Sequence, residues 1–113
     1  MTIVIACNEV AGTHCWENCP VGFPHPYLKS PHRHIFFIET EFEVSDEDRQ
    51  IEIFEAQDNI NRFIEKHYGK NSAGIDFGGD SCEMIARKIV EAMGAKQCTV
   101  REDNKGGATY VRS

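Results

Sequence analysis

The stretch Ser30-Pro31-His32-Arg33-His34-Ile35-Phe36-Phe37-Ile38-Glu39-Thr40-Glu41-Phe42-Glu43-Val44 reads as one long strand that opens on two histidines. Successive strand residues point to opposite faces of a sheet, so the even-numbered positions share one face. That face carries two imidazoles and then mostly apolar side chains: His32, His34, Phe36, Ile38, Thr40, Phe42 and Val44. The other face is mostly charged. The pattern predicts a strand whose buried face ends in two imidazoles at the rim of a sheet.

Two histidines at this spacing are candidate metal ligands, because a neutral imidazole is a common zinc ligand. Structural and catalytic zinc sites use at least three protein ligands, so His32 and His34 need a further ligand from elsewhere in the chain. The alternative is a pair of rim histidines that hydrogen-bond to the backbone or to water.

Length and composition favour a single globular domain over residues 1–113. The formal net charge of −6 argues against a nucleic-acid partner. No apolar run is long enough to cross a bilayer, and residues 1–6 lack the basic region of a signal peptide. The odd count of five cysteines then predicts a cytoplasmic protein with reduced thiols and no membrane association.

A long loop is predicted before the histidine strand. Residues 2–9 are rich in Ile and Val and predict a first strand, whereas residues 11–31 contain all four prolines of the chain. Loops of this length inside a compact domain are usually functional. This one carries His14, Cys15, Cys19 and His25 beside Trp16, the one tryptophan of the chain.

Two helices and two strands are predicted in the rest of the chain. After a short extended return at residues 50–54, apolar periodicity predicts helices over residues 55–68 and 81–93, separated by a loop at 70–79. Residues 96–102 and 108–112 predict a final hairpin. The order β-β-α-α-β-β predicts an α+β fold, with a four-stranded antiparallel sheet and both helices on one face. Glu102 then continues the inward face of its strand to the rim, where its alternative role is a solvated surface carboxylate.

This element order and three short motifs resemble the family of 6-pyruvoyl-tetrahydropterin synthase and 6-carboxy-tetrahydropterin synthase, which has the tunnelling fold, or T-fold. The motifs are His32-Arg33-His34, Ser81-Cys82-Glu83 and Val100-Arg101-Glu102-Asp103, together with a histidine before the long loop. The resemblance implies zinc bound by His14, His32 and His34, and a pterin ring gripped by Glu102. It implies a zinc-dependent lyase that acts on a dihydropterin-type substrate in pterin or 7-deazapurine biosynthesis, such as queuosine biosynthesis.

The sequence departs from the family at its proton-transfer residues. Leu28 stands where the family has a catalytic cysteine, and Cys15 and Cys19 of the same loop are candidate replacements. Asp76 is the candidate for the aspartate of the family's Asp-His pair, whose histidine has no counterpart here.

Few cations are near the predicted site for a triphosphate substrate. The candidate substrate-binding cations are Lys29 and Arg33, with Arg101 and Lys105 as further candidates. The resemblance also implies a ring-shaped homo-oligomer, for which unpaired sheet edges give a physical reason.

Three functions remain open from the sequence. The first is the zinc-dependent synthase or lyase acting on a pterin or purine-like ligand. The second is a non-catalytic binding or scaffold protein of the same fold that keeps the zinc site. The third is a structural zinc site built from Cys15, Cys19, His25 and a histidine of the strand.

Overall fold

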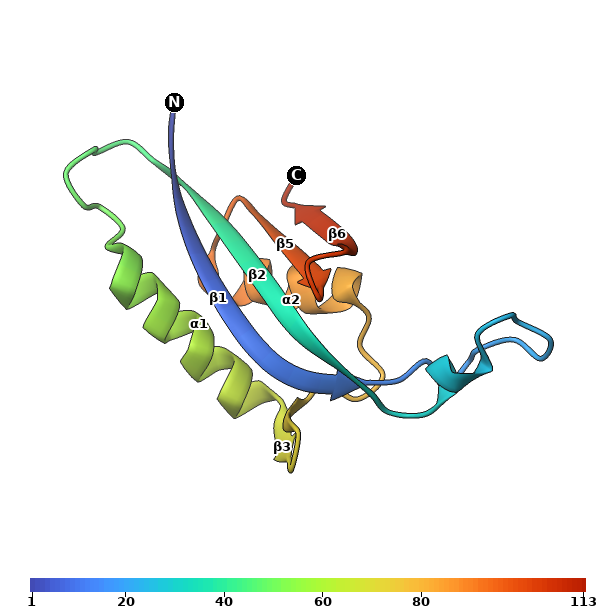
Figure 1. Cartoon of the computed structure of the whole chain (residues 1–113). Helices are drawn as coiled ribbons and strands as arrows, with labels where there is room; N and C mark the ends of the chain where they lie inside the picture. Colours follow the sequence, from blue (N-terminus) through green and yellow to red (C-terminus); the bar gives the residue numbers. More distant parts are fainter.

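The computed structural model describes residues 1–113, and Figure 1 shows their arrangement. No helix in it is long and apolar enough to cross a membrane. The elements in chain order are β1 (Thr2–His14), the 3-10 helix η1 (Pro26–Lys29), β2 (His32–Val44), α1 (Ile53–His67), β3 (Gly69–Asn71), β4 (Gly74–Asp76), α2 (Cys82–Met93), β5 (Gln97–Glu102) and β6 (Gly106–Val111).

The strands form one six-stranded sheet in the order β3-β4-β1-β2-β5-β6. Strand β4 runs parallel to β1, and the other neighbours are antiparallel. The α+β class and the two helices are therefore as predicted, whereas the prediction of a four-stranded antiparallel sheet is wrong. The two additional strands have three residues each. Strands this short show no readable alternation, so residues 70–79 had the sequence signature of a loop.

The long hairpin of β1 and β2 brings the first histidine to the other two. The strands pair along their whole length, from Thr2 opposite Val44 to His14 opposite His32. The prediction that the first strand ends near residue 9 is wrong, because β1 continues to His14. A side chain at Gly12 would meet the Phe77 ring at 2.8 Å, so a glycine is required where the sheet and the chain after β4 approach each other.

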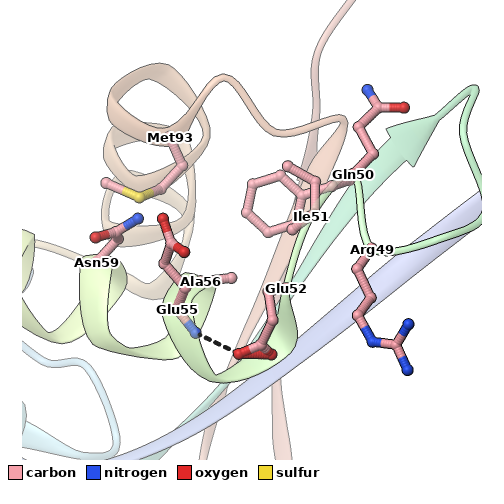
Figure 2. A pocket seen from close by; sticks show the side chains of 9 residues that line it. Arg49, Gln50, Ile51, Glu52, Glu55, Ala56, Asn59 and Met93 are labelled. Carbon is pink, nitrogen blue, oxygen red and sulfur yellow. Dashed lines mark hydrogen bonds between the residues drawn. The ribbon is translucent and has the colours of Figure 1, made fainter.

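The helix α1 begins at Ile53, two residues earlier than predicted, so residues 53 and 54 are not part of an extended return. The carboxylate of Glu52 accepts hydrogen bonds from the backbone N–H groups of Phe54 and Glu55, as Figure 2 shows for Glu55. A side-chain acceptor at this position satisfies N–H groups that the first helical turn leaves free.

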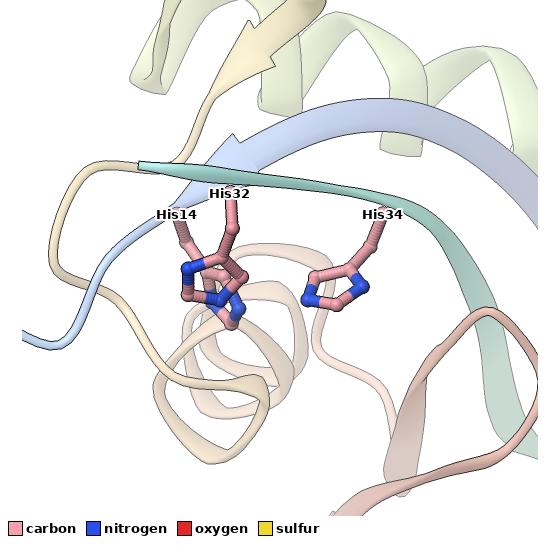
Figure 3. Close-up of side chains that lie close together, drawn as sticks. All are labelled: His14, His32 and His34. Carbon is pink, nitrogen blue, oxygen red and sulfur yellow. The ribbon is translucent and has the colours of Figure 1, made fainter. Parts of the chain in front are cut away.

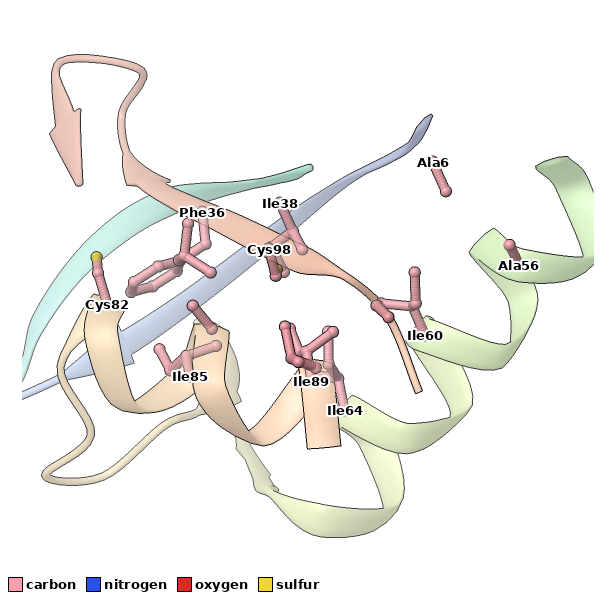
Figure 4. Packing of buried hydrophobic residues seen from close by; sticks show 14 of the residues in the cluster. Ala6, Phe36, Ile38, Ala56, Ile60, Ile64, Cys82, Ile85, Ile89 and Cys98 are labelled. Atoms are coloured by element: carbon pink, nitrogen blue, oxygen red, sulfur yellow. The ribbon is translucent and has the colours of Figure 1, made fainter. Parts of the chain in front are cut away.

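Both helices pack on the same face of the sheet and enclose one core, part of which Figure 4 shows. The inward residues Phe36 and Ile38 of β2 are buried there against Ile60 of α1 and Ile85 of α2. Burial of such a side chain stabilises the fold by about 1.5–3 kcal/mol. The core fixes which face of β2 is inward, and so directs the histidines that precede Phe36 to the same side.

Candidate metal centre

Three imidazoles meet where the β1–β2 hairpin opens into the long loop. His14 ends β1, His32 begins β2, and His34 follows one inward position further along β2. Figure 3 shows all three rings on one side of the two strands. Their centroids are 4.6 to 5.3 Å apart, and one ring nitrogen from each lies within 4.8 Å of the others.

Each imidazole is held through its Nδ1 atom by a group that accepts hydrogen bonds. His14 Nδ1 lies 2.9 Å from the carbonyl oxygen of Asp80, and His32 Nδ1 lies 2.9 Å from that of Ser30. His34 Nδ1 lies 2.7 Å from a carboxylate oxygen of Asp103. Because carbonyl and carboxylate oxygens only accept, each Nδ1 carries a proton, and the Nε2 of the neutral ring presents a lone pair.

The local charges and burial favour this protonation state. The hydrogen bond from His34 lowers the pKa of the Asp103 carboxyl, which keeps it ionised. Burial lowers the pKa of His14 and outweighs the raising effect of its hydrogen bond to Asp80, which keeps that ring neutral at physiological pH.

The Nε2 side of the cluster gathers acceptors, and none of the three neutral imidazoles donates a hydrogen bond there. The carboxylate of Glu102 lies 3.3 Å from His14 Nε2 and 3.4 Å from His34 Nε2. His34 Nε2 is buried and has no hydrogen-bond partner. Buried polar atoms are normally satisfied, so a buried lone pair aimed at other lone pairs calls for a cation. Three imidazole nitrogens are a donor set that fits zinc.

No other group of three or more ligand side chains gathers in this way, so Cys15, Cys19 and His25 do not form a second metal cluster. The third function left open by the sequence, a structural zinc site on sulfur, therefore has no geometric support. The first two remain.

A cavity of about 450 Å³ adjoins the histidines. Its lining combines apolar and acidic side chains with two imidazoles: His14, Cys15, Trp16, Leu28, His32, Gly79, Asp80, Ser81, Glu83, Met84 and Glu102. A second cavity of about 470 Å³ shares Glu83 and Glu102 with the first and is also lined by His34, Cys82, Asp103, Lys105 and two glycines. Glu102 therefore borders two spaces that could receive a ligand.

The candidate proton-transfer residues are placed differently. Cys15 lines the first cavity, and burial is the main cause that raises the pKa of its thiol. Cys19 lies outside both cavities, with its thiol beside the carbonyl of Pro20. Asp76 is exposed and accepts a hydrogen bond from the backbone N–H of Gly78. Of the three, the fold brings only Cys15 to the histidines.

The candidate substrate-binding residues also separate. Glu102 lies at the histidines, whereas Lys29 and Arg33 are exposed and line neither cavity. Arg33 lies between His32 and His34 on the strand and therefore faces the opposite side of the sheet. Lys105 is the one cation among the residues that line the two cavities.

Several residues of the site were not identified from the sequence. Asp103 has a backbone φ of 52°, and its carboxylate accepts hydrogen bonds from His34 and from the backbone N–H of Ile35. In the sequence, the one indication of this role was its position directly after Glu102. The Asp80 side chain accepts hydrogen bonds from Tyr68 and Lys88, which holds the backbone carbonyl that orients His14.

Cys82 is a further residue that the sequence did not identify. Its thiol lies 3.6 Å from Glu102. Burial raises the pKa of Cys82 to about 12, so it is a protonated donor to that carboxylate.

No family model matches the sequence, and no curated protein matches it. Among solved structures, the chain is similar to 6-pyruvoyl tetrahydropterin synthase of Caenorhabditis elegans, with a TM-score of 0.69 and 11% sequence identity. The match covers 99% of this chain and 96% of that one. A likeness at this identity extends to the fold, and the chain therefore has an α+β fold similar to that of a pterin synthase over nearly its whole length.

Proposed function

We propose that the protein is a zinc-dependent enzyme similar to 6-pyruvoyl- and 6-carboxy-tetrahydropterin synthases, a lyase that acts on a dihydropterin-type substrate. The observation that carries the proposal is the set of three Nδ1-bonded imidazoles whose free nitrogens face one another beside Glu102 and a cavity. When bound, zinc supplies Lewis-acid stabilisation of negative charge on a substrate oxygen. The product belongs to pterin or 7-deazapurine biosynthesis.

The side chains around the cavity have distinct roles in this proposal. The Glu102 carboxylate accepts N–H bonds from the ring, because a charged acceptor forms the stronger hydrogen bonds. Trp16 and Met84 offer apolar surface to the ring. Cys15 holds a proton at its Sγ atom, since its raised pKa favours the thiol. Four further candidates would contact the substrate only if the long loop or a second copy of the chain brings them to the cavity. They are Cys19, Asp76, Lys29 and Arg33.

Leu28 favours a second candidate function, a non-catalytic protein of the same fold that binds a pterin or purine-like ring and keeps the zinc. Leu28 lines the cavity at the position where the resemblance places a catalytic cysteine. A leucine side chain neither donates nor accepts a proton. The ring pocket is kept in this alternative and turnover is lost.

A homo-oligomer is part of the proposal. Strand β1 pairs with β4 only at Gly12 and Thr13, so most of its outer edge has no strand partner. Ile3, Ile5 and Ile35 are exposed on the sheet face away from the helices. Unpaired edges and apolar faces favour association with further strands. Sedimentation at micromolar concentration should show an assembly larger than one chain, and a monomer would contradict the homo-oligomer.

A cytoplasmic location is consistent with five free cysteines.

Calorimetry of zinc-saturated protein with pterin, neopterin and guanine tests the ring pocket. Wild type should bind at least one ring, and Glu102→Gln should bind it about ten- to a hundredfold more weakly, because a donor NH2 replaces a charged acceptor. Glu43→Gln is the matched control, since Glu43 is an exposed carboxylate of β2 that lines neither cavity. No binding by wild type, or equal binding by Glu102→Gln, would contradict the pocket.

Turnover separates the two candidate functions. Zinc-loaded wild type should convert dihydroneopterin triphosphate or its dephosphorylated form if the protein is a synthase. Ring binding without any conversion would favour the non-catalytic alternative.

A further inference from the structure

Glu102 faces the metal side of two histidines without hydrogen-bonding to them. Its Oε1 atom is 3.3 Å from His14 Nε2, and its Oε2 atom is 3.4 Å from His34 Nε2. Both separations exceed the usual 2.7–3.2 Å range of an N–H···O hydrogen bond. The Nδ1 partners already place the proton of each neutral ring on its other nitrogen. Carboxylate oxygens and lone pairs therefore oppose each other here.

The same separations fit a shared metal ion. Zinc binds imidazole nitrogen and carboxylate oxygen at about 2.0–2.2 Å, and tetrahedral angles then separate two ligand atoms by about 3.3–3.5 Å. Oε1 has this separation from His14 Nε2 and Oε2 has it from His34 Nε2, so each oxygen of Glu102 meets the ligand spacing with one of the two imidazoles.

The carboxylate is directed by the surrounding fold. Glu102 is the last residue of β5 and pairs with Phe36 of β2, next to the histidines along that strand. The Cys82 thiol lies 3.6 Å from Oε1 and reaches it from the start of α2. About a third of the Glu102 side chain remains exposed, at 34%, and it borders both cavities. The carboxylate is thus directed at the histidines and still has room to turn.

We propose that Glu102 is a direct metal ligand in the ligand-free protein and that it leaves the metal when its carboxylate turns to the N–H groups of a bound ring. The inference rests on the zinc site of the proposed function and adds a fourth protein ligand to it. When both carboxylate oxygens accept paired N–H groups of the ring, neither is left for the metal. Ring binding and the opening of a coordination position are therefore a single event.

Metal affinity and the visible spectrum of the cobalt(II) protein test the proposal without any measurement of activity. Competition with a chromophoric chelator should show that Glu102→Gln binds zinc at least about tenfold more weakly than wild type. Loss of a residue that only supports a ligand weakens metal binding by about ten- to a hundredfold, so the expected loss is at least the smallest of these. Glu102→Asp keeps the charge and shortens the reach, so it should also bind zinc more weakly. Glu43→Gln removes an exposed carboxylate of β2 that lines neither cavity and should stay within about twofold of wild type. Circular dichroism and thermal unfolding check that each variant is folded.

Cobalt absorption reports the ligands directly. The visible bands of wild type should change in Glu102→Gln and should not change in Glu43→Gln. Pterin added to wild-type cobalt protein should produce a change that is absent in Glu102→Gln. Unchanged zinc affinity and unchanged bands in folded Glu102→Gln would overturn the proposal, even if the ring still binds. Weaker zinc binding in Glu102→Gln combined with no ring binding by wild type would support a Glu102 ligand and contradict the pterin pocket.

Discussion

The two ends of the β1–β2 hairpin both carry polar side chains beside a cavity, yet they differ in how those side chains are satisfied. At the far end, a cavity of about 190 Å³ lies between the turn after β2 and α1 (Figure 2). There the Gln50 side chain accepts hydrogen bonds from the backbone N–H groups of Ser45 and Asp46, and Glu52 accepts from the start of α1. These acceptors are matched by donors from the same chain.

At the histidine end, the acceptors face one another instead. The Nε2 atoms of His14 and His34 meet the carboxylate of Glu102, and His34 Nε2 is buried without a partner. Both ends of the hairpin have charged side chains beside a cavity. An unmatched set of acceptors is therefore what distinguishes the candidate metal centre from the far end of the hairpin.

The largest expected effect is at the histidine end. His34→Ala removes one of three imidazole ligands and should weaken zinc binding by more than about a hundredfold, the upper range for loss of an outer-shell partner. The fold should persist, because the side chain lies at the rim of the core. Metal content and chelator competition measure this. His67→Ala is the control, since His67 lies at the exposed end of α1 and stacks on Phe63. Full retention of zinc by His34→Ala would contradict the assignment of the metal site.

A smaller loss is expected where the ligand is kept and its support is removed. Asp103→Ala takes away the carboxylate that orients His34 and should weaken zinc binding about ten- to a hundredfold. Chelator competition measures the loss. Asp76→Ala is matched to it, because Asp76 also accepts a backbone N–H and touches none of the three imidazoles. Equal zinc affinity in the two variants would show that Asp103 does not hold the ring.

The smallest expected effect is at the far end. Glu52→Ala removes the side-chain cap of α1 and should lower the free energy of unfolding by about 0.5–2 kcal/mol. Zinc affinity should not change, since Glu52 lies at the opposite end of the hairpin from the histidines. Urea unfolding and chelator competition measure the two quantities on the same sample. Weaker zinc binding by Glu52→Ala would contradict the expectation that only the histidine end of the hairpin affects the metal.

The sequence predicted those features that follow from side-chain alternation. The period of two along β2 placed His32 and His34 on the inward face with Phe36, and the pattern at Cys98 and Val100 placed Glu102 on the inward face of β5. The resemblance supplied His14, and the register of the hairpin brings it opposite His32.

Other features lacked a sequence signal. The hydrogen bonds of His14 and His32 go to backbone carbonyls of Asp80 and Ser30, and every residue has such a carbonyl. The strands β3 and β4 are too short for periodicity, and β1 continues to His14 through its pairing with β2 and β4. Long-range packing of this kind is visible only in the folded chain.

X-ray absorption at the zinc edge of the purified wild-type protein, combined with elemental analysis, tests the metal centre most directly. A site built by His14, His32 and His34 predicts about one zinc per chain with only nitrogen and oxygen ligands, at about 2.0–2.2 Å. Absence of bound metal after incubation with zinc, or sulfur ligands at about 2.3 Å from Cys15 or Cys19, would contradict it.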